Sequence, residues 1–382
     1  MSKPVCSLPK SQTLSYRLLL LTALSGEYPV ESVSRLPGGH AYNSTIMTTL
    51  KKKKLLRSFS RDGLLGLRLT ASCKKLFLEE WPDALSPFLT GVSETNRPKC
   101  EAARRARLHR MAEVLTLMAN ANVVFTPWEK PSFFRTRHNL PPNTLPLPVY
   151  YTCKEVKEIG APAKKFTSSR FTGILFTDGG IYIVYNTRNG EVVWEARSEE
   201  RLRATVFAEV SQNLLRADYV NAEINCIIFG RDMAAMPVLM AAKDGCKRNY
   251  FVLDSSYPHF YFLPDDRKGE DMLRLLYDNT LRIRFNSVLQ EGLQPSTADF
   301  LTENDAIDEN GDPVLFAYLC DMPRIQRFCN GLNIHGRTGT MICFDFQESA
   351  MRQVCGNRVA IQTVNFQRFK EAFLSTEESG SV

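Results

Sequence analysis

The sequence has little that would place it in or across a membrane. Its apolar runs are short, such as the four residues Leu18–Leu21, whereas a transmembrane helix needs about 20 apolar residues. The N-terminal segment also lacks the long apolar core and the small-residue cleavage site of a signal peptide. We therefore expect a cytoplasmic protein without a membrane partner.

The patterns of common cofactor and metal sites are also missing. The ten cysteines include no CxxC pair, which is typical of reduced thiols, and the five histidines form neither HExxH nor a zinc-ligand spacing. Neither GxGxxG nor GxxxxGK[ST] occurs, and the serine-hydrolase pattern GxSxG is absent. We expect no catalytic residue of these kinds, no metal and no cofactor.

What the sequence does have is an uneven charge. Residues 1–150 hold 22 Lys and Arg against 10 Asp and Glu, a net charge of +12, whereas the remaining residues hold 26 against 31, a net charge of −5. A polyanion such as DNA would therefore contact the first part of the chain. Basic halves also occur in proteins that bind no nucleic acid.

The stretch from His40 to Arg57 combines an apolar stripe with a polar face, which predicts an amphipathic helix. Short hydrogen-bonding side chains come first on its polar face, and four consecutive lysines follow. A helix that reads base edges in the major groove and grips phosphates needs this combination. A solvated helix face that ends in lysines is the alternative, since cations also favour a helix C-terminus.

The elements around this helix favour the first interpretation. A helix over residues 12–25, a short helix from Pro29 to Leu36 and the break at Pro37–Gly39 precede it. Strands at 55–59 and 65–70, joined by the turn Arg61-Asp62-Gly63, follow it. This order predicts a winged helix-turn-helix domain over residues 1–82. Its expected DNA-binding residues are Tyr42, Asn43, Ser44, Thr45, Thr48, Lys51, Lys52, Lys53, Lys54, Arg57, Arg61 and Arg68.

Residues 83–149 are expected to form a basic helix and a proline-rich connector. Residues 82–98 are polar and broken, which is typical of a hinge, and residues 101–122 are helical, with Arg104, Arg105, Arg107 and Arg110 on a solvent face. His109 has no companion at metal-ligand spacing, so we interpret it as structural. Residues 125–148 carry six prolines and should be irregular.

Strands then alternate with helices over residues 150–374, which predicts an α/β domain with a mixed sheet. Residues 375–382 should be a disordered tail. We expect strands at 171–177, 181–185, 226–229, 250–254, 314–319, 340–346 and 359–364, and helices at 199–215, 233–242, 269–276, 324–331 and 349–353.

A metal-dependent DNA-cleaving enzyme is the alternative function, because such nucleases hold Mg²⁺ with two carboxylates, usually beside a lysine. The nearest candidates are Asp178, Glu191 and Glu195 with Lys164 and Lys165 upstream, and Asp254 ends a predicted strand. Asp178, however, heads a Gly-Gly turn, where aspartate is favoured by turn chemistry alone.

Four segments of the first part of the chain carry a resemblance to a known family: residues 16–24, 44–59, 66–77 and 108–123. Through them the first domain resembles the replication-relaxation family, winged-helix proteins of plasmids and integrative elements in Gram-positive bacteria. The resemblance covers residues 12–125 and, loosely, 166–215. It implies a histidine-bearing helix like that around His109, followed by a domain like a degenerate restriction-endonuclease fold. This chain lacks the family's carboxylates near Ser169–Gly173 and Tyr185-Asn186, which argues against cleavage.

The sequence thus predicts a sequence-specific double-stranded DNA-binding protein of a mobile element, acting in plasmid replication, mobilisation or transcriptional control. Replication or transfer proteins are candidate further partners, docked by residues 150–374, and a homodimer is a candidate assembly.

Overall fold

A computed structural model describes residues 7–133, 145–157, 169–188, 193–212, 222–242, 250–296 and 302–375. The protein is of the mixed α/β class, and its described residues fall into two compact units. The first comprises residues 1–167, 171–176 and 204–221, and the second comprises residues 168–170, 177–203 and 222–382. The described residues between 83 and 149 fall in the first unit.

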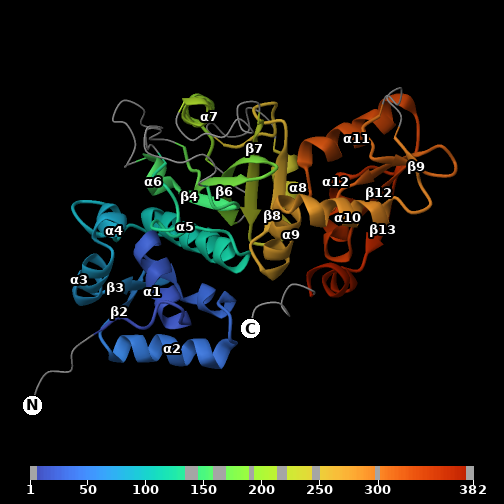
Figure 1. Ribbon diagram of the computed structural model, residues 1–382. Coiled ribbons are helices and arrows are strands. Elements are labelled where there is room, and N and C mark those ends of the chain that lie inside the picture. The colour runs from blue at the N-terminus through green and yellow to red at the C-terminus, as the bar shows by residue number, and fades with distance from the viewer. Residues whose placement is uncertain are drawn as a thin grey trace, which may run out of the picture. The chain divides into compact units, whose positions relative to one another are not determined.

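The first unit is mainly helical (Figure 1). Its helices are α1 (Leu14–Ser25), η1 (Val30–Arg35, a 3-10 helix), α2 (His40–Lys52), α3 (Ala71–Glu80), α4 (Pro82–Leu89), α5 (Ala102–Asn120) and α6 (Cys153–Lys157). Its strands are β1 (Tyr28–Pro29), β2 (Leu56–Arg61), β3 (Leu64–Leu69), β4 (Val149–Thr152) and β5 (Gly173–Thr177, whose last residue is assigned to the second unit). Helix α7 (Ala196–Gln212) has residues in both units.

Helix α1 forms the centre of this unit, because Tyr16 and every residue from Leu18 to Ser25 are buried. Thr13 caps its first turn, and Leu18, Leu21 and Leu24 are fully buried. It packs against α5, α4 and α2 (Figure 1). Gly26 then ends the helix with a φ of 82°, a left-handed conformation that suits glycine.

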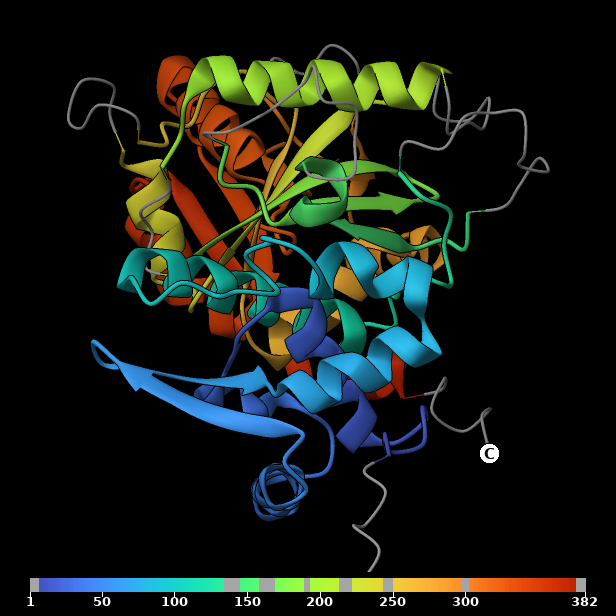
Figure 2. The ribbon, with the colours of Figure 1, turned by 90° about the vertical axis from the view of Figure 1, so that its left-hand side faces the viewer.

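A three-stranded sheet with the order β1-β3-β2 lies beside these helices. Strands β2 and β3 pair antiparallel, from Leu56 opposite Leu69 to Arg61 opposite Leu64. Asp62 and Gly63 both have positive φ, as a two-residue hairpin turn of type I′ requires. Figure 2 views α2 along its axis, with the long β2–β3 hairpin above it.

Two predictions for this region are wrong. Residues 82–98 were expected to be a broken hinge, but they contain α4, because Pro82 occupies the first helical turn, where its missing N–H costs nothing. The four arginines of α5 were expected to lie on a solvent-exposed face, but Arg105 is fully buried. The described parts of residues 125–148 hold no helix and no extended strand, as predicted.

The second unit carries the remaining elements. Its strands are β6 (Gly180–Arg188), β7 (Ile224–Gly230), β8 (Phe260–Pro264), β9 (Gln294–Pro295), β10 (Ala306–Ile307), β11 (Pro313–Phe316), β12 (Gly339–Phe344) and β13 (Val359–Val364). Its helices are α8 (Ala235–Met240), α9 (Arg267–Tyr277), α10 (Asn279–Leu289), α11 (Met322–His335), η4 (Asp345–Gln347), α12 (Glu348–Val354), α13 (Phe366–Phe369) and η5 (Lys370–Leu374).

Its strands form parallel runs, in keeping with the alternation of strands and helices. β6, β7 and β8 pair parallel to one another. β11, β12 and β13 also pair parallel, while the short strands β10 and β9 continue that sheet antiparallel, so this sheet is mixed.

The predicted strand at residues 250–254 is not formed, apart from a single bridge between Tyr250 and Val193. Its apolar character has another cause, because Phe251 packs in an aromatic cluster against Trp194 and Phe260. The strand in this region is β8 instead. The predicted tail, apart from Ser375, lies outside the described residues.

Candidate nucleic-acid interface

Helix α2 presents most of its surface to solvent. Ile46 and Leu50 form the buried stripe that holds it against the rest of the unit. Tyr42 is 56% exposed, and Thr45 and Thr48 are exposed as well. Each threonine hydroxyl donates to the carbonyl four residues earlier and keeps acceptor capacity for a second partner.

The basic end of this helix is also accessible. Ser44 and Lys51 are half-buried, whereas the side chains of Lys52, Lys53 and Lys54 are exposed. The helix ends at Lys52, and Lys54 turns the chain into β2 with a φ of 56°. The lysines therefore stand where the helix passes into the hairpin.

Asn43 was predicted to read DNA, and the structure corrects this. Its side chain is buried, and its amide nitrogen donates to the carbonyl oxygens of Val33 at 3.1 Å and Leu36 at 2.9 Å. It therefore ties α2 to η1 and cannot contact a ligand without breaking both bonds.

The hairpin adds two exposed arginines. Arg57 stands near the start of β2, and Arg61 stands beside the turn, where it pairs with Asp62 at 3.5 Å. Both side chains remain accessible to a polyanion.

Arg68 was also predicted to contact DNA, and this is wrong. Its side chain is 5% exposed and pairs with Glu27, with a distance of 2.6 Å between guanidinium and carboxylate. Its other nitrogens donate to the carbonyl oxygens of Pro98 and Lys99. Arg68 is therefore part of the scaffold beneath the hairpin.

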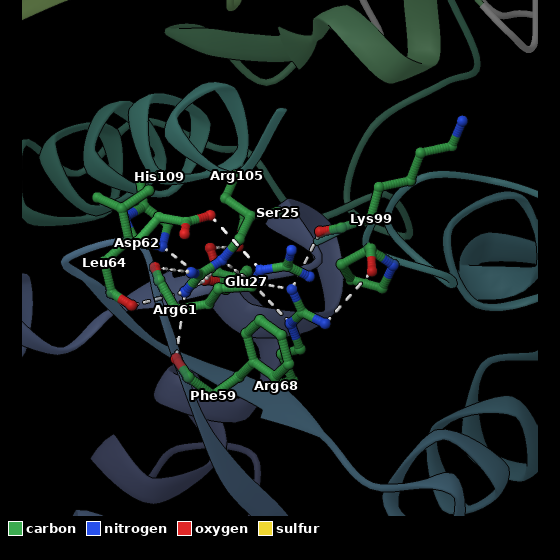
Figure 3. Close-up of polar contacts among 11 residues, drawn as sticks. Ser25, Glu27, Phe59, Arg61, Asp62, Leu64, Arg68, Lys99, Arg105 and His109 are labelled. Atoms are coloured by element: carbon green, nitrogen blue, oxygen red, sulfur yellow. Dashed lines mark hydrogen bonds and ion pairs between the residues drawn. The ribbon is translucent and has the colours of Figure 1, made fainter. Parts of the chain in front are cut away.

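Glu27 is the centre of a buried ionic cluster (Figure 3). Its fully buried carboxylate interacts with Arg68, with Arg105 at 2.6 Å and with Nε2 of His109 at 2.8 Å. Burial alone would raise the pKa of this carboxyl, but the hydrogen bonds from His109, Arg105 and Arg68 lower it to about 2. Glu27 is thus held ionised by its partners.

Arg105 links this cluster to the hairpin. Its guanidinium reaches past Glu27 and donates to the carbonyl oxygens of Arg61 at 2.7 Å, Leu64 at 2.9 Å and Phe59 at 3.1 Å (Figure 3). These carbonyls flank the turn on both strands. One side chain from α5 therefore fixes the position of the hairpin tip.

Two further features complete the cluster. The ring of Phe59 lies 3.8 Å from the guanidinium carbon of Arg68 and 4.8 Å from that of Arg105, which is cation–π geometry. At Gly66 a Cβ atom would lie 2.2 Å from Oε1 of Glu27, so glycine leaves the space that the carboxylate occupies.

The carboxylates considered for a nuclease are not brought together among the described residues. Asp178 lies in the turn before β6, the side chain of Glu195 accepts from Ser198, and Asp254 accepts from the backbone of Ser256. No group of three or more His, Cys, Asp or Glu side chains that could hold a metal occurs in the described parts of the chain. Glu191, Lys164 and Lys165 lie outside them.

Sequence reasoning missed Glu27 and Arg105 as a pair. The signal that was available is the isolated acid in LTALSGEYPV, a charge in an otherwise apolar stretch, which needs a buried partner. His109 was interpreted as structural, and the structure places it in this cluster.

No family model, curated protein or solved structure matches the chain. Within the described residues, no helix combines the length and the apolar character needed to span a bilayer.

Proposed function

We propose that this protein binds double-stranded DNA through its first unit, as a winged helix-turn-helix protein with α2 as the recognition helix and the β2–β3 hairpin as the wing. The observation that carries the proposal is the exposed face of α2, where hydrogen-bonding side chains are followed by exposed lysines beside an anchored basic hairpin. Short polar side chains on a helix match base edges, and cations at its end match phosphates.

The roles divide by chemistry. Tyr42, Ser44, Thr45 and Thr48 would read base edges from the exposed face of α2, whereas Lys51–Lys54, Arg57 and Arg61 would contact the backbone. Asn43 and Arg68 would act indirectly, since one orients α2 and the other fixes the hairpin.

The biological setting follows from the resemblance to replication-relaxation proteins. It favours a target on a plasmid or integrative element, in replication, mobilisation or transcriptional control, within the cytoplasm. A homodimer, and docking of replication or transfer proteins by residues 150–374, belong to the same proposal. A degenerate restriction-endonuclease-like fold for that part would suit docking, because the family's carboxylates are missing from it.

Selection from a random duplex library tests the proposal. The full-length protein should retain duplexes at low salt, and repeated selection should enrich a common sequence. Tyr42→Ala and Thr45→Ala should weaken that enrichment without changing the salt dependence of binding, because base contacts release few counterions. Failure to retain any duplex at low salt would contradict the proposal.

A further inference from the structure

Behind the hairpin, the first unit contains a cavity of about 290 Å³ with a strongly basic lining. Four cationic side chains converge on it, from β2, β3, α3 and the loop after α4. They are Arg57, Arg68, Lys74 and Arg97. The described residues that line the cavity include no carboxylate.

The charges in this cavity are poorly balanced by the protein itself. Arg57 and Arg68 are directly opposite one another across β2 and β3, and like charges at such positions repel. Glu27 compensates Arg68, but Lys74 donates to neutral acceptors, the carbonyl and side-chain oxygens of Asn96. Arg57 and Arg97 stand exposed at the cavity.

Burial and the crowding of positive charges both lower the pKa of Lys74. Burial lowers the pKa of its ammonium group, and the positive charges of Arg57, Arg68 and Arg97 lower it further. An anion in the cavity would relieve this repulsion.

We infer that this cavity binds a phosphate ester group, supplied either by a nucleic-acid backbone or by a free phosphorylated small molecule. Arg57 and Arg97 can each donate two hydrogen bonds to phosphate oxygens, and Lys74 adds a point charge. The volume lies at the lower end of ligand pockets, roughly 300–1,000 Å³, so a phosphate and the group esterified to it would fit.

This inference is independent of base reading by α2. Arg57 was expected from the sequence to contact phosphate, but Lys74 and Arg97 were not, because both lie outside the predicted recognition helix and hairpin.

Calorimetric titration of the full-length protein with pyrophosphate and with a nucleoside monophosphate tests the inference, together with duplex titration followed by fluorescence anisotropy. Arg97→Ala changes an exposed loop residue and should leave the fold intact. Lys74→Met removes the half-buried ammonium group. Lys75→Ala is the matched control, because Lys75 is the next residue on α3 and its side chain is 80% exposed and paired with Glu79.

We expect Arg97→Ala and Lys74→Met to weaken binding about tenfold or more, as removal of a charge-assisted hydrogen bond predicts, and Lys75→Ala to bind like the wild type. Loss of pyrophosphate or nucleotide binding would identify a free phosphorylated ligand. Loss confined to the duplex would identify the backbone as the source. The inference is overturned if Arg97→Ala binds pyrophosphate, nucleotide and duplex as tightly as Lys75→Ala does. It is also overturned if neither variant binds pyrophosphate, nucleotide or duplex. A protein that binds pyrophosphate but no duplex keeps this inference and loses the proposed function.

Discussion

Glu27 is buried, yet through Arg105 it helps to fix the exposed β2–β3 hairpin. Its carboxylate is buried, interacts with three basic side chains and faces a glycine on the neighbouring strand. A buried ion pair contributes little net stability compared with apolar packing, but removal of one member leaves the others uncompensated. The cluster therefore acts mainly by fixing geometry, and its loss should be costly.

Glu27→Gln should lower the free energy of unfolding at pH 7 by about 3–5 kcal/mol, because Arg68 and Arg105 would stay buried without their counter-ion. Urea denaturation followed by circular dichroism measures this. Glu79→Gln is the control, since Glu79 sits on an exposed helix face, and it should stay within about 0.5 kcal/mol of the wild type.

The same residue predicts a pH dependence. The folded-state pKa of Glu27 is about 2, below the value of 4.5 expected for an unpaired glutamate, so its contribution to stability is present above pH 4.5. That contribution is lost as the pH falls toward 2. The difference in unfolding free energy between wild type and Glu27→Gln should narrow over that window. A difference that stays constant down to about pH 2.5 would contradict the assignment.

Gly66→Ala tests the space around the carboxylate. The added methyl group would lie 2.2 Å from Oε1 of Glu27, which three partners hold in place, so we expect a loss of about 1–3 kcal/mol from overpacking. Thermal and urea denaturation measure the loss. Gly356→Ala, where a Cβ atom would meet nothing within 4 Å, should be close to neutral.

At the scale of elements, the sequence predicted what depends on local pattern. The apolar stripe of α2 and the Asp62-Gly63 turn are each encoded within a few residues, and both are present. The cluster that fixes the hairpin could not be found in this way, because Glu27 and Arg105 are 78 residues apart. An arginine on a helix gives the same local signal whether it faces solvent or a buried carboxylate.

Arg105→Lys should loosen the hairpin while keeping the charge. Lysine cannot reproduce the planar set of donors that reaches three carbonyl oxygens on β2 and β3. We expect faster amide hydrogen exchange in residues 56–69, measured by mass spectrometry. Arg104→Lys, at an exposed position paired with Glu101, should leave exchange unchanged.

At the scale of the whole molecule, the net charge is distributed unevenly along the chain. The excess of basic residues in positions 1–150 coincides largely with the first unit, and residues 83–149 belong with it because α5 supplies the anchor for the hairpin. Composition predicted that a polyanion would contact the first part of the chain. It could not show that Asn43 and Arg68 turn inward, since burial depends on interactions with η1, Glu27 and the loop after α4.

The salt dependence of duplex binding tests the central claim most directly. The slope of log affinity against log salt should be steep for the wild type, and Lys52→Ala combined with Lys53→Ala should reduce it by about one unit for each phosphate that the protein no longer neutralises. The control combines Arg358→Ala with Arg368→Ala, which removes the same charge from exposed positions of the second unit. We predict a wild-type slope for the control. Equal reductions in both double variants would show a general charge effect and would contradict DNA binding through α2.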